Sequence, residues 1–146
     1  MTELKINILK RFRNKIIDWL HSKQRMLNLM IGLSALVIYE AARVTYRPYI
    51  YSRGIYDFHI ADTLGNSLGT VATIFVFVSL FGRDRAQAYF LIRTVTISVL
   101  VYEVAHPVLG KPIDPWDILA TVLAGVFCEI LHRLIHKQPQ AILQES

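Results

Sequence analysis

The sequence predicts an all-α membrane protein with four transmembrane helices, built as two tandem copies of one helical hairpin. Three observations support this fold class. Hydrophobic residues make up 53% of the 146 residues, more than an ordinary soluble domain carries. Four mostly apolar stretches each approach the roughly 20 residues that a helix needs to cross a bilayer. A short pattern of polar residues also recurs at the ends of the first and third stretches.

The chain begins with a segment that predicts a basic amphipathic helix, residues 1–25. Leu9, Phe12 and Ile16 recur at helical spacing, and Lys and Arg residues occupy the other side. A helix of this kind lies at the surface of an anionic leaflet and binds membrane lipids. It offers no aromatic or glycine platform for bases, so no nucleic-acid partner is expected.

The transmembrane domain is predicted over residues 26–137, and a polar, disordered tail follows at residues 138–146. The four spans cover about residues 26–46, 60–81, 86–105 and 116–135. The loops between them are expected at residues 47–59, 82–85 and 106–115. Pro and Gly residues in the first and third loops indicate that the helices end there.

The distribution of basic residues predicts the orientation of the spans. The N-terminal segment, the second loop and the C-terminal end carry eleven Lys and Arg residues, against three in the first and third loops. Basic loops stay on the cytoplasmic side. We therefore expect a multi-pass protein of the bacterial inner membrane with both termini in the cytoplasm.

An internal repeat relates the two halves of the chain. Residues 39–43 and 102–106 share the pattern Y-E-x-A-[R/H], and each copy is followed by a loop and by an Asp that opens the next span, Asp62 or Asp117. Both hairpins run in the same direction. They are therefore expected to form parallel repeats about a pseudo-two-fold axis along the membrane normal.

The repeat places four carboxylates at the same end of the bundle. Asp62 and Asp117 open helices, where helix capping is an ordinary role. Glu40 and Glu103 lie near helix C-termini, where the helix dipole disfavours a negative charge. The sequence therefore predicts either a polar network that locks the helices together or an outward-facing binding pocket. The residues expected to line this pocket are Glu40, Arg43, Asp62, Asn66, Glu103, His106, Asp117 and Thr121.

Two further charges lie deep within spans. Arg93 and Glu129 have comparable depths in the third and fourth spans, so they are expected to form a structural ion pair, since intramembrane charges rarely stand alone. The small residues of Gly65-x-x-x-Gly69, and of Ala120-x-x-x-Ala124 with Gly125, are expected to let helices approach closely.

These residues resemble the VanZ-like family of small bacterial membrane proteins. The resemblance rests on Glu40-x-x-Arg43, on Arg53-Gly54 and on Asp62-x-x-x-Asn66-x-x-Gly69, with a weaker second copy that starts at Glu103. Arg43 and His106 stand where the family usually has Gln, and Thr121 replaces the expected Asn. The namesake of the family is associated with low-level resistance to the antibiotic teicoplanin. The resemblance therefore implies a role in the cell envelope and names no reaction.

Three classes of function follow from these patterns. The first is a non-enzymatic envelope protein whose pocket binds a lipid head group, a glycopeptide or a cell-wall precursor. The second is a membrane enzyme that acts on phosphate-bearing lipids, in which Glu40, Asp62, Glu103 and Asp117 hold a divalent cation such as Mg²⁺. The third is an effector that forms homo-oligomers in the membrane, or a small transporter. The sequence carries no nucleophile motif or nucleotide-binding loop, so it does not decide whether the protein is an enzyme.

Overall fold

The computed structural model describes residues 23–136. The predicted tail and nearly all of the predicted amphipathic helix lie outside these residues. The described part is helical throughout and contains four helical segments that are long and apolar enough to cross a membrane. The predicted number of spans is therefore confirmed.

The first span is longer than predicted. Helix α2 (Lys23–Val44) is followed after one residue by α3 (Tyr46–Arg53), where the sequence analysis expected the loop of residues 47–59. Pro48 does not break α3 because it lies in the first turn, where its missing N–H has no helical partner. Gly54 ends α3 in the left-handed conformation, with φ of 62°.

The second span contains a π-helical turn. It consists of α4 (Ile60–Leu64), the π-helix η1 (Gly65–Gly69) and α5 (Thr70–Phe81). A π-helical turn accommodates an extra residue within a continuous helix and turns the faces before and after it relative to each other. Such turns are frequent at functional sites.

The second hairpin has two capped helices. Asp84 accepts a hydrogen bond from the Gln87 backbone N–H at the start of α6 (Arg85–Val104). Asp114 caps α7 (Pro115–Ile135) in the same way. Between them, the 3₁₀-helix η2 (His106–Leu109) ends at Gly110, which is also left-handed. The bounds of α6 and α7 agree with the predicted spans to within one residue.

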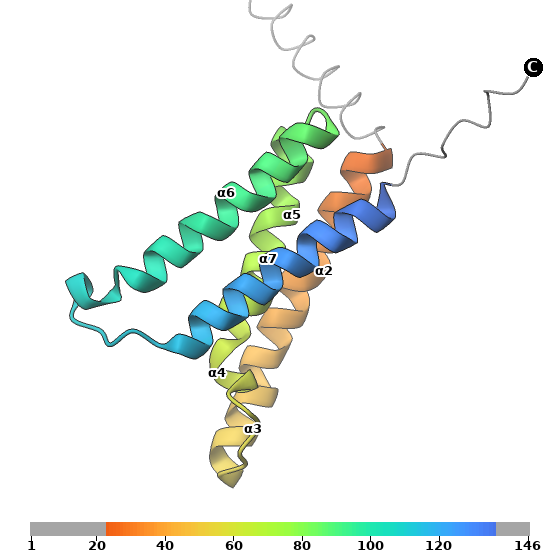
Figure 1. The fold of residues 1–146 in the computed structure, drawn as a ribbon. Coiled ribbons are helices and arrows are strands. Elements are labelled where there is room, and N and C mark those ends of the chain that lie inside the picture. The colour runs from red at the N-terminus through yellow and green to blue at the C-terminus, as the bar shows by residue number, and fades with distance from the viewer. Residues whose placement is uncertain (1–22, 137–146) are drawn as a thin grey trace, which may run out of the picture.

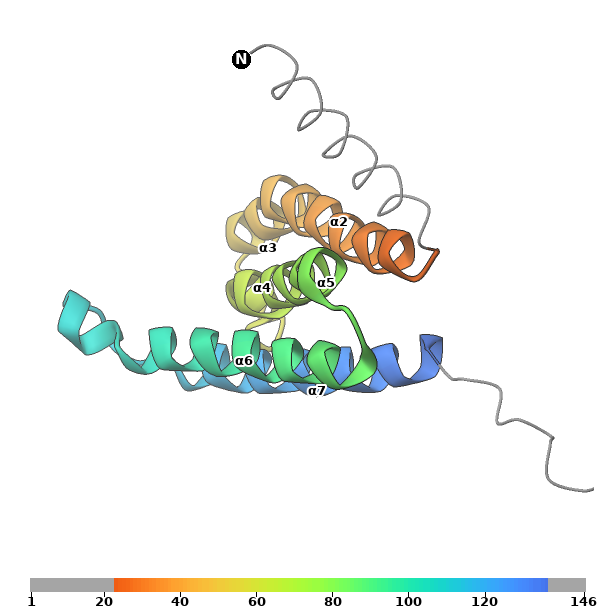
Figure 2. The same ribbon diagram turned by 90° about the horizontal axis from the view of Figure 1, so that it is seen from above.

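The helices form a bundle in which α5 is the central element. Seen along the bundle, α5 lies between α2 on one side and the pair α6 and α7 on the other (Figure 2). The segment Ile60–Phe81 is accordingly the most buried span, at 44% of its apolar window against 17–28% for the others. Figure 1 shows that α6 slants away from α2, so that η2 and α3 lie apart at the far end of the molecule.

The two ends of the bundle bring together different helix ends and connections. The start of α2, the turn between α5 and α6, and the end of α7 share one end, which we call the termini end (Figure 1). Helix α3, η2 and the two longer connections lie toward the other end, which we call the loop end. The candidate site residues of the predicted repeat belong to the loop end.

Small residues set the closest helix contacts. A Cβ atom added at Gly32 would lie 3.0 Å from the backbone nitrogen of Val76, so α2 packs directly on α5. A Cβ atom at Gly125 would lie 2.6 Å from the side chain of Thr96, so α7 packs equally closely on α6. Around these contacts, Ile74, Phe75 and Ile92 are fully buried and form the centre of the core.

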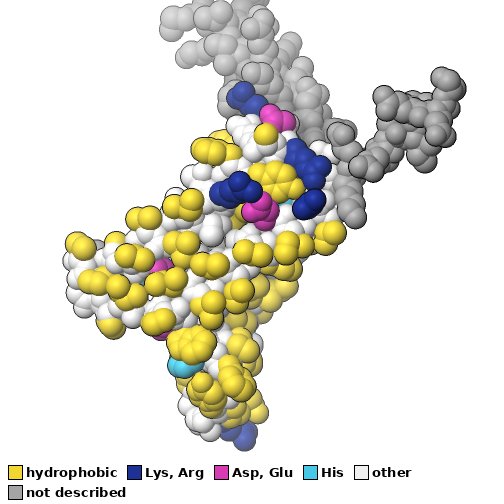
Figure 3. Space-filling model, viewed as in Figure 1, with side chains coloured by type: hydrophobic (Ala, Val, Ile, Leu, Met, Phe, Trp, Pro, Cys, Tyr) yellow, Lys and Arg dark blue, Asp and Glu magenta, His cyan; other side chains and the backbone are white. Residues whose placement is uncertain are grey.

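Large apolar side chains cover much of the outer surface. Leu, Ile, Val and Phe residues are exposed along all four spans, as the space-filling view shows for one face (Figure 3). Contiguous exposed apolar surface on this scale is unfavourable in water and is the normal surface of a lipid-exposed helix bundle. The described residues therefore form a multi-pass transmembrane domain.

Candidate functional site

The candidate site residues occupy three separate places near the loop end of the bundle. From the sequence, all eight were expected to line one pocket. Among the described residues, the structure instead forms an exposed ion pair on α2, a hydrogen-bonded cluster between α3 and α4, and a buried cluster around Glu103. Each place has different surroundings and therefore a different chemistry.

The exposed ion pair joins Glu40 and Arg43 on one face of α2. The Arg43 Nη2 atom lies 2.7 Å from Glu40 Oε2, and Nε donates a hydrogen bond of 2.9 Å to the same oxygen. About half of each side chain is exposed. In the described structure neither residue hydrogen-bonds to the other six, so this pair stabilises its own helix end and does not line a pocket.

The second place is a cluster centred on Asp62 at the start of α4. Its carboxylate accepts a hydrogen bond from the Tyr51 hydroxyl and lies 3.3 Å from His59 Nδ1. The His59 ring stacks on Trp116, with ring centroids 5.1 Å apart. The cluster therefore connects α3, α4 and the start of α7. Its hydrogen bonds join residues of the first hairpin only, and the stack of His59 on Trp116 is its contact with the second hairpin.

The third place is the buried cluster around Glu103, in the last turn of α6. Glu103 is only 2% exposed, and its Oε2 atom lies 3.2 Å from His106 Nδ1. Asn66 of η1 is within hydrogen-bonding reach of the carboxylate, and Asp117 of α7 is near enough to act on its charge. Four of the eight predicted residues thus come together here, from four helical elements.

A groove opens beside Glu103 and runs along the bundle between α6 and the segment η1–α5. Its volume is about 570 Å³. The end near Glu103 is polar, and the walls toward the middle of the spans are largely apolar. The lining residues are Gly65, Asn66, Gly69, Thr70, Thr73, Phe77, Leu91, Thr94, Val95, Ser98, Val99, Tyr102 and Glu103.

Two buried polar atoms of the groove make no hydrogen bond. They are Oγ1 of Thr70, a residue that is 2% exposed, and Oε2 of Glu103, whose neighbour is the His106 ring of the ion pair described above. The other hydroxyls behave differently: Thr73 and Ser98 donate to backbone carbonyls one turn earlier in their own helices. An unpaired polar atom in a low-dielectric interior is costly, so these two atoms mark where the groove can accept a polar ligand.

The groove exists because its wall contains Gly65 and Gly69. The sequence analysis expected these glycines to bring two helices together, and this prediction was wrong. A Cβ atom at Gly69 would meet nothing within 4 Å, and one at Gly65 only the Tyr39 hydroxyl at 3.9 Å. The missing side chains leave space between η1 and α6. For the second predicted contact, Gly125 does bring α7 close to α6.

The one remaining residue of the predicted pocket is Thr121. Thr121 is fully buried, and its hydroxyl donates to the Asp117 carbonyl oxygen at 2.9 Å, so it belongs to the helix interior. The metal hypothesis required Glu40, Asp62, Glu103 and Asp117 to converge. Within residues 23–136 no group of three or more His, Cys, Asp or Glu side chains is arranged to hold a metal ion.

Arg93 and Glu129, which the sequence analysis paired, lie opposite each other on α6 and α7. The Arg93 Nη2 atom is 2.5 Å from Glu129 Oε1. The pair is on the outer surface of these helices, with the Arg93 side chain 65% exposed. It joins the two helices of the second hairpin at the height of the membrane.

Sequence reasoning missed the hydroxyl-bearing walls of the groove. Thr70 and Thr73 in the second span, and Thr94 and Ser98 in the third, lie three or four residues apart and so share helix faces. That spacing was a usable signal. Tyr51, His59 and Trp116 were not predicted as members of the Asp62 cluster. Their contacts depend on how α3 turns beside α4 and α7.

Comparison with known proteins finds no match for this chain among protein-family models, curated proteins or solved structures.

Proposed function

We propose that this protein is a non-enzymatic membrane protein of the bacterial envelope that binds a lipid in the groove between α6 and η1–α5. One observation supports the proposal above the others: the buried carboxylate of Glu103 lies at the polar end of a largely apolar groove, and its Oε2 atom has the nearby His106 ring but no hydrogen bond. An amphiphile matches this arrangement, with its head group at Glu103 and its chain along Phe77, Leu91 and Val95.

The position of the groove favours a lipid over a soluble glycopeptide. Its walls belong to membrane spans, and Thr73, Phe77 and Tyr102 are exposed on their outer surfaces. The groove therefore opens sideways, toward the region that acyl chains occupy. A ligand already dissolved in the bilayer reaches it without crossing water.

The charges near the groove select the head group. The carboxylates of Asp114 and Asp117 lie near that of Glu103 and make this end of the groove acidic. His106 is the basic neighbour of Glu103. A phosphate placed against these carboxylates would be repelled. The ligand is therefore a lipid whose head group donates hydrogen bonds to Glu103 and Asn66, through an ammonium group or sugar hydroxyls. The motif resemblance to the VanZ-like family supports a role in the cell envelope and does not select the head group.

The proposal includes an orientation, with Glu103 on the exoplasmic side. The termini end carries Lys23, Arg25, Arg83, Arg85 and Arg133 of the described residues. Under the positive-inside rule this end faces the cytoplasm. A reporter enzyme that works only outside the cytoplasm is expected to show activity when it is fused after Gly54. Activity of a cytoplasmic reporter at that position would reverse the orientation.

The test compares three lipids whose head groups differ in hydrogen-bond donors. The purified full-length protein in detergent is incubated with phosphatidylethanolamine, phosphatidylcholine or glucosyl diacylglycerol, and bound lipid is measured by native mass spectrometry. A hydrogen bond to a charged group contributes roughly 1.5–3 kcal/mol, so we expect about tenfold or greater preference for a donor-bearing lipid over phosphatidylcholine. Equal retention of all three lipids would overturn the proposal.

Two variants assign the binding to the groove. Gly69→Leu adds a side chain where a Cβ atom meets open space, so it is expected to fill the groove and abolish retention while the bundle stays folded. Val122→Leu makes a small apolar change on the outer surface of α7 and serves as the control. If Gly69→Leu retained the lipid as well as the control does, the groove would not be the binding site.

A further inference from the structure

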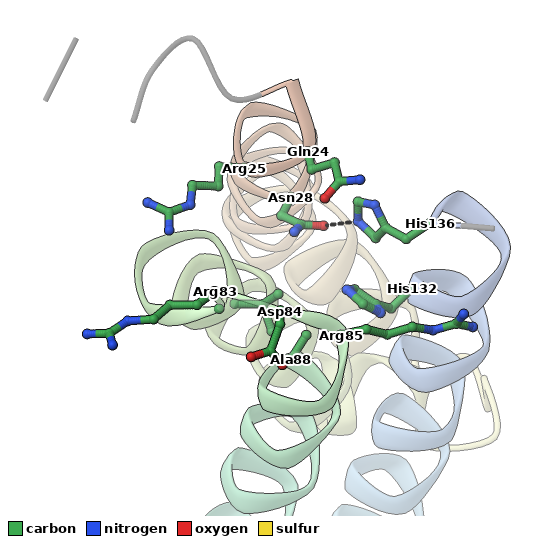
Figure 4. Close-up of a pocket in the computed structure, with 11 residues that line it drawn as sticks. Gln24, Arg25, Asn28, Arg83, Asp84, Arg85, Ala88, His132 and His136 are labelled. Atoms are coloured by element: carbon green, nitrogen blue, oxygen red, sulfur yellow. Dashed lines mark hydrogen bonds between the residues drawn. The ribbon is translucent and has the colours of Figure 1, made fainter. Parts of the chain in front are cut away.

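A second cavity lies at the opposite, termini end of the bundle. It has a volume of about 280 Å³ and lies between the start of α2, the turn from α5 to α6 and the end of α7 (Figure 4). Arg25, Arg83 and Arg85 line it together with His132 and His136. The proposed groove function uses none of these residues.

The cavity has an excess of basic groups that carboxylates do not neutralise. Within the described structure, none of the three arginines that line it forms an ion pair with Asp or Glu. The acidic residue of the lining, Asp84, already accepts the Gln87 N–H as the cap of α6. In Figure 4 the side chains of Arg25 and Arg83 extend outward on one side of the cavity and that of Arg85 outward on the other, where its guanidinium group donates to the Tyr89 hydroxyl. Arg83 and Arg85 are exposed, and contact with a ligand in the cavity requires these two side chains to rotate inward.

The floor of the cavity contains a buried histidine with an unused polar atom. His132 is 4% exposed, and its Nδ1 atom has no hydrogen-bond partner. Its ring is held by Tyr89, with centroids 5.4 Å apart, and by His136, at 4.5 Å. His136 Nε2 is in turn 3.0 Å from the Asn28 amide oxygen (Figure 4). Tyr89 and His136, with Asn28 behind His136, thus hold in place an imidazole that lines the cavity.

We propose that this cavity binds a phosphate-bearing anion, with His132 Nδ1–H and the guanidinium groups of Arg83 and Arg85 as hydrogen-bond donors. Guanidinium groups match the geometry of phosphate oxygens, and arginine is the residue most suited to such recognition. Basic pockets between transmembrane helices at this depth bind the phosphate groups of lipids. A phospholipid head group and a free phosphate offer the same chemistry, and experiment separates them.

The experiment measures the thermal stability of the full-length protein in a neutral detergent. Phosphatidylglycerol, phosphatidylcholine and inorganic phosphate are added separately. A ligand that binds only the folded state raises the midpoint of unfolding in proportion to its occupancy. We expect phosphatidylglycerol to raise the midpoint more than phosphatidylcholine does. A rise with inorganic phosphate of the same size identifies free phosphate as the ligand.

Variants then locate the effect. Arg83→Gln and Arg85→Gln are changes of exposed side chains and leave the core intact, and each is expected to weaken the apparent affinity about tenfold through one lost charge-assisted hydrogen bond. Arg53→Gln removes an exposed arginine at the loop end and is the matched control. Gly69→Leu, which fills the groove, is expected to leave this response unchanged, so the two sites fail independently. The proposal is overturned if neither phosphate ligand raises the midpoint, or if the double Arg83→Gln, Arg85→Gln variant responds as the control does.

Discussion

The buried carboxylate of Glu103 is joined to His106 one helical turn away, with 3.2 Å between Oε2 and Nδ1. The two side chains are 3% and 13% exposed, so the contact lies inside the protein although His106 is already part of η2. A carboxylate in such surroundings is stable only with a partner.

Replacing His106 with Ala is expected to destabilise the protein, because Glu103 then loses its basic neighbour. Leaving a buried polar group unpaired costs about 1–3 kcal/mol, which thermal unfolding in detergent can measure. Glu103→Gln removes the charge and keeps the shape, so its stability is expected to stay near that of the unmodified protein. The double variant is expected to be more stable than His106→Ala alone. A His106→Ala protein of unchanged stability would show that the contact contributes nothing.

Glu103→Gln also separates a structural role from a binding role. If Glu103 recognises a head group that donates hydrogen bonds, the folded variant is expected to lose about tenfold or more of its preference for phosphatidylethanolamine over phosphatidylcholine. Native mass spectrometry of bound lipid measures this preference. A variant that folds normally and keeps the preference would leave Glu103 as a structural residue only.

The Arg93–Glu129 pair is expected to behave as a unit. Because it lies at membrane height on the outer surface, removing one partner leaves an isolated charge in lipid. Arg93→Leu and Glu129→Leu are each expected to be destabilising, and the double variant less so than the sum. Additive effects in this double-mutant cycle would show that the two charges do not interact in the membrane.

The positions of the spans could be predicted from the sequence because hydropathy and length constrain them directly. Asp84 and Asp114 precede α6 and α7 as ordinary caps, and the spans end where apolar residues end. Helix α3 could not be predicted in this way. Pro48 reads as a helix breaker, yet in a first turn it is fully compatible with helix, and only the left-handed Gly54 ends the segment.

The candidate site was only partly predictable because residue spacing does not fix the direction of a side chain. Asp62 and Asn66 are four residues apart and were expected to line the same pocket. The π-helix begins between them, at Gly65, so Asp62 contacts Tyr51 while Asn66 reaches Glu103. The slant of α6 separates the two clusters further (Figure 1). Neither a π-helical turn nor a helix tilt has a reliable signature in a single sequence.

The glycines of the bundle are expected to respond differently to substitution. Gly125→Leu places a side chain against Thr96, where even a Cβ atom would approach to 2.6 Å, so α6 and α7 must separate. Such overpacking typically costs about 1–3 kcal/mol. Gly69→Ala enters open space in a helical backbone and is expected to be neutral or stabilising by up to about 1 kcal/mol. Thermal unfolding of the two variants compares them, and equal destabilisation would contradict the open groove beside Gly69.

Acid is expected to destabilise the termini end through His136. Burial, and secondarily the positive charge of Arg85, lower the pKa of His136 below its ordinary value. His132 on its own helix, and Gln24, Arg25 and Asn28 on α2, line the same cavity. Because the unfolded chain then binds the proton more readily, His136 contributes stability above about pH 6.5, and this contribution is lost as the pH falls toward its folded pKa.

Substituting His136 with Gln tests this dependence. Glutamine keeps a donor for the Asn28 amide oxygen and cannot titrate, so the variant is expected to lose less stability than the unmodified protein between about pH 7.5 and pH 5.5. His59→Gln, at the loop end, is the control for histidine removal in general. The measurement is the midpoint of thermal unfolding across this pH range. The detergent solution contains no phosphate, because an anion bound at the arginines would favour the protonated imidazole and mask the effect. An acid sensitivity that is the same in His136→Gln and in the unmodified protein would show that another group is responsible.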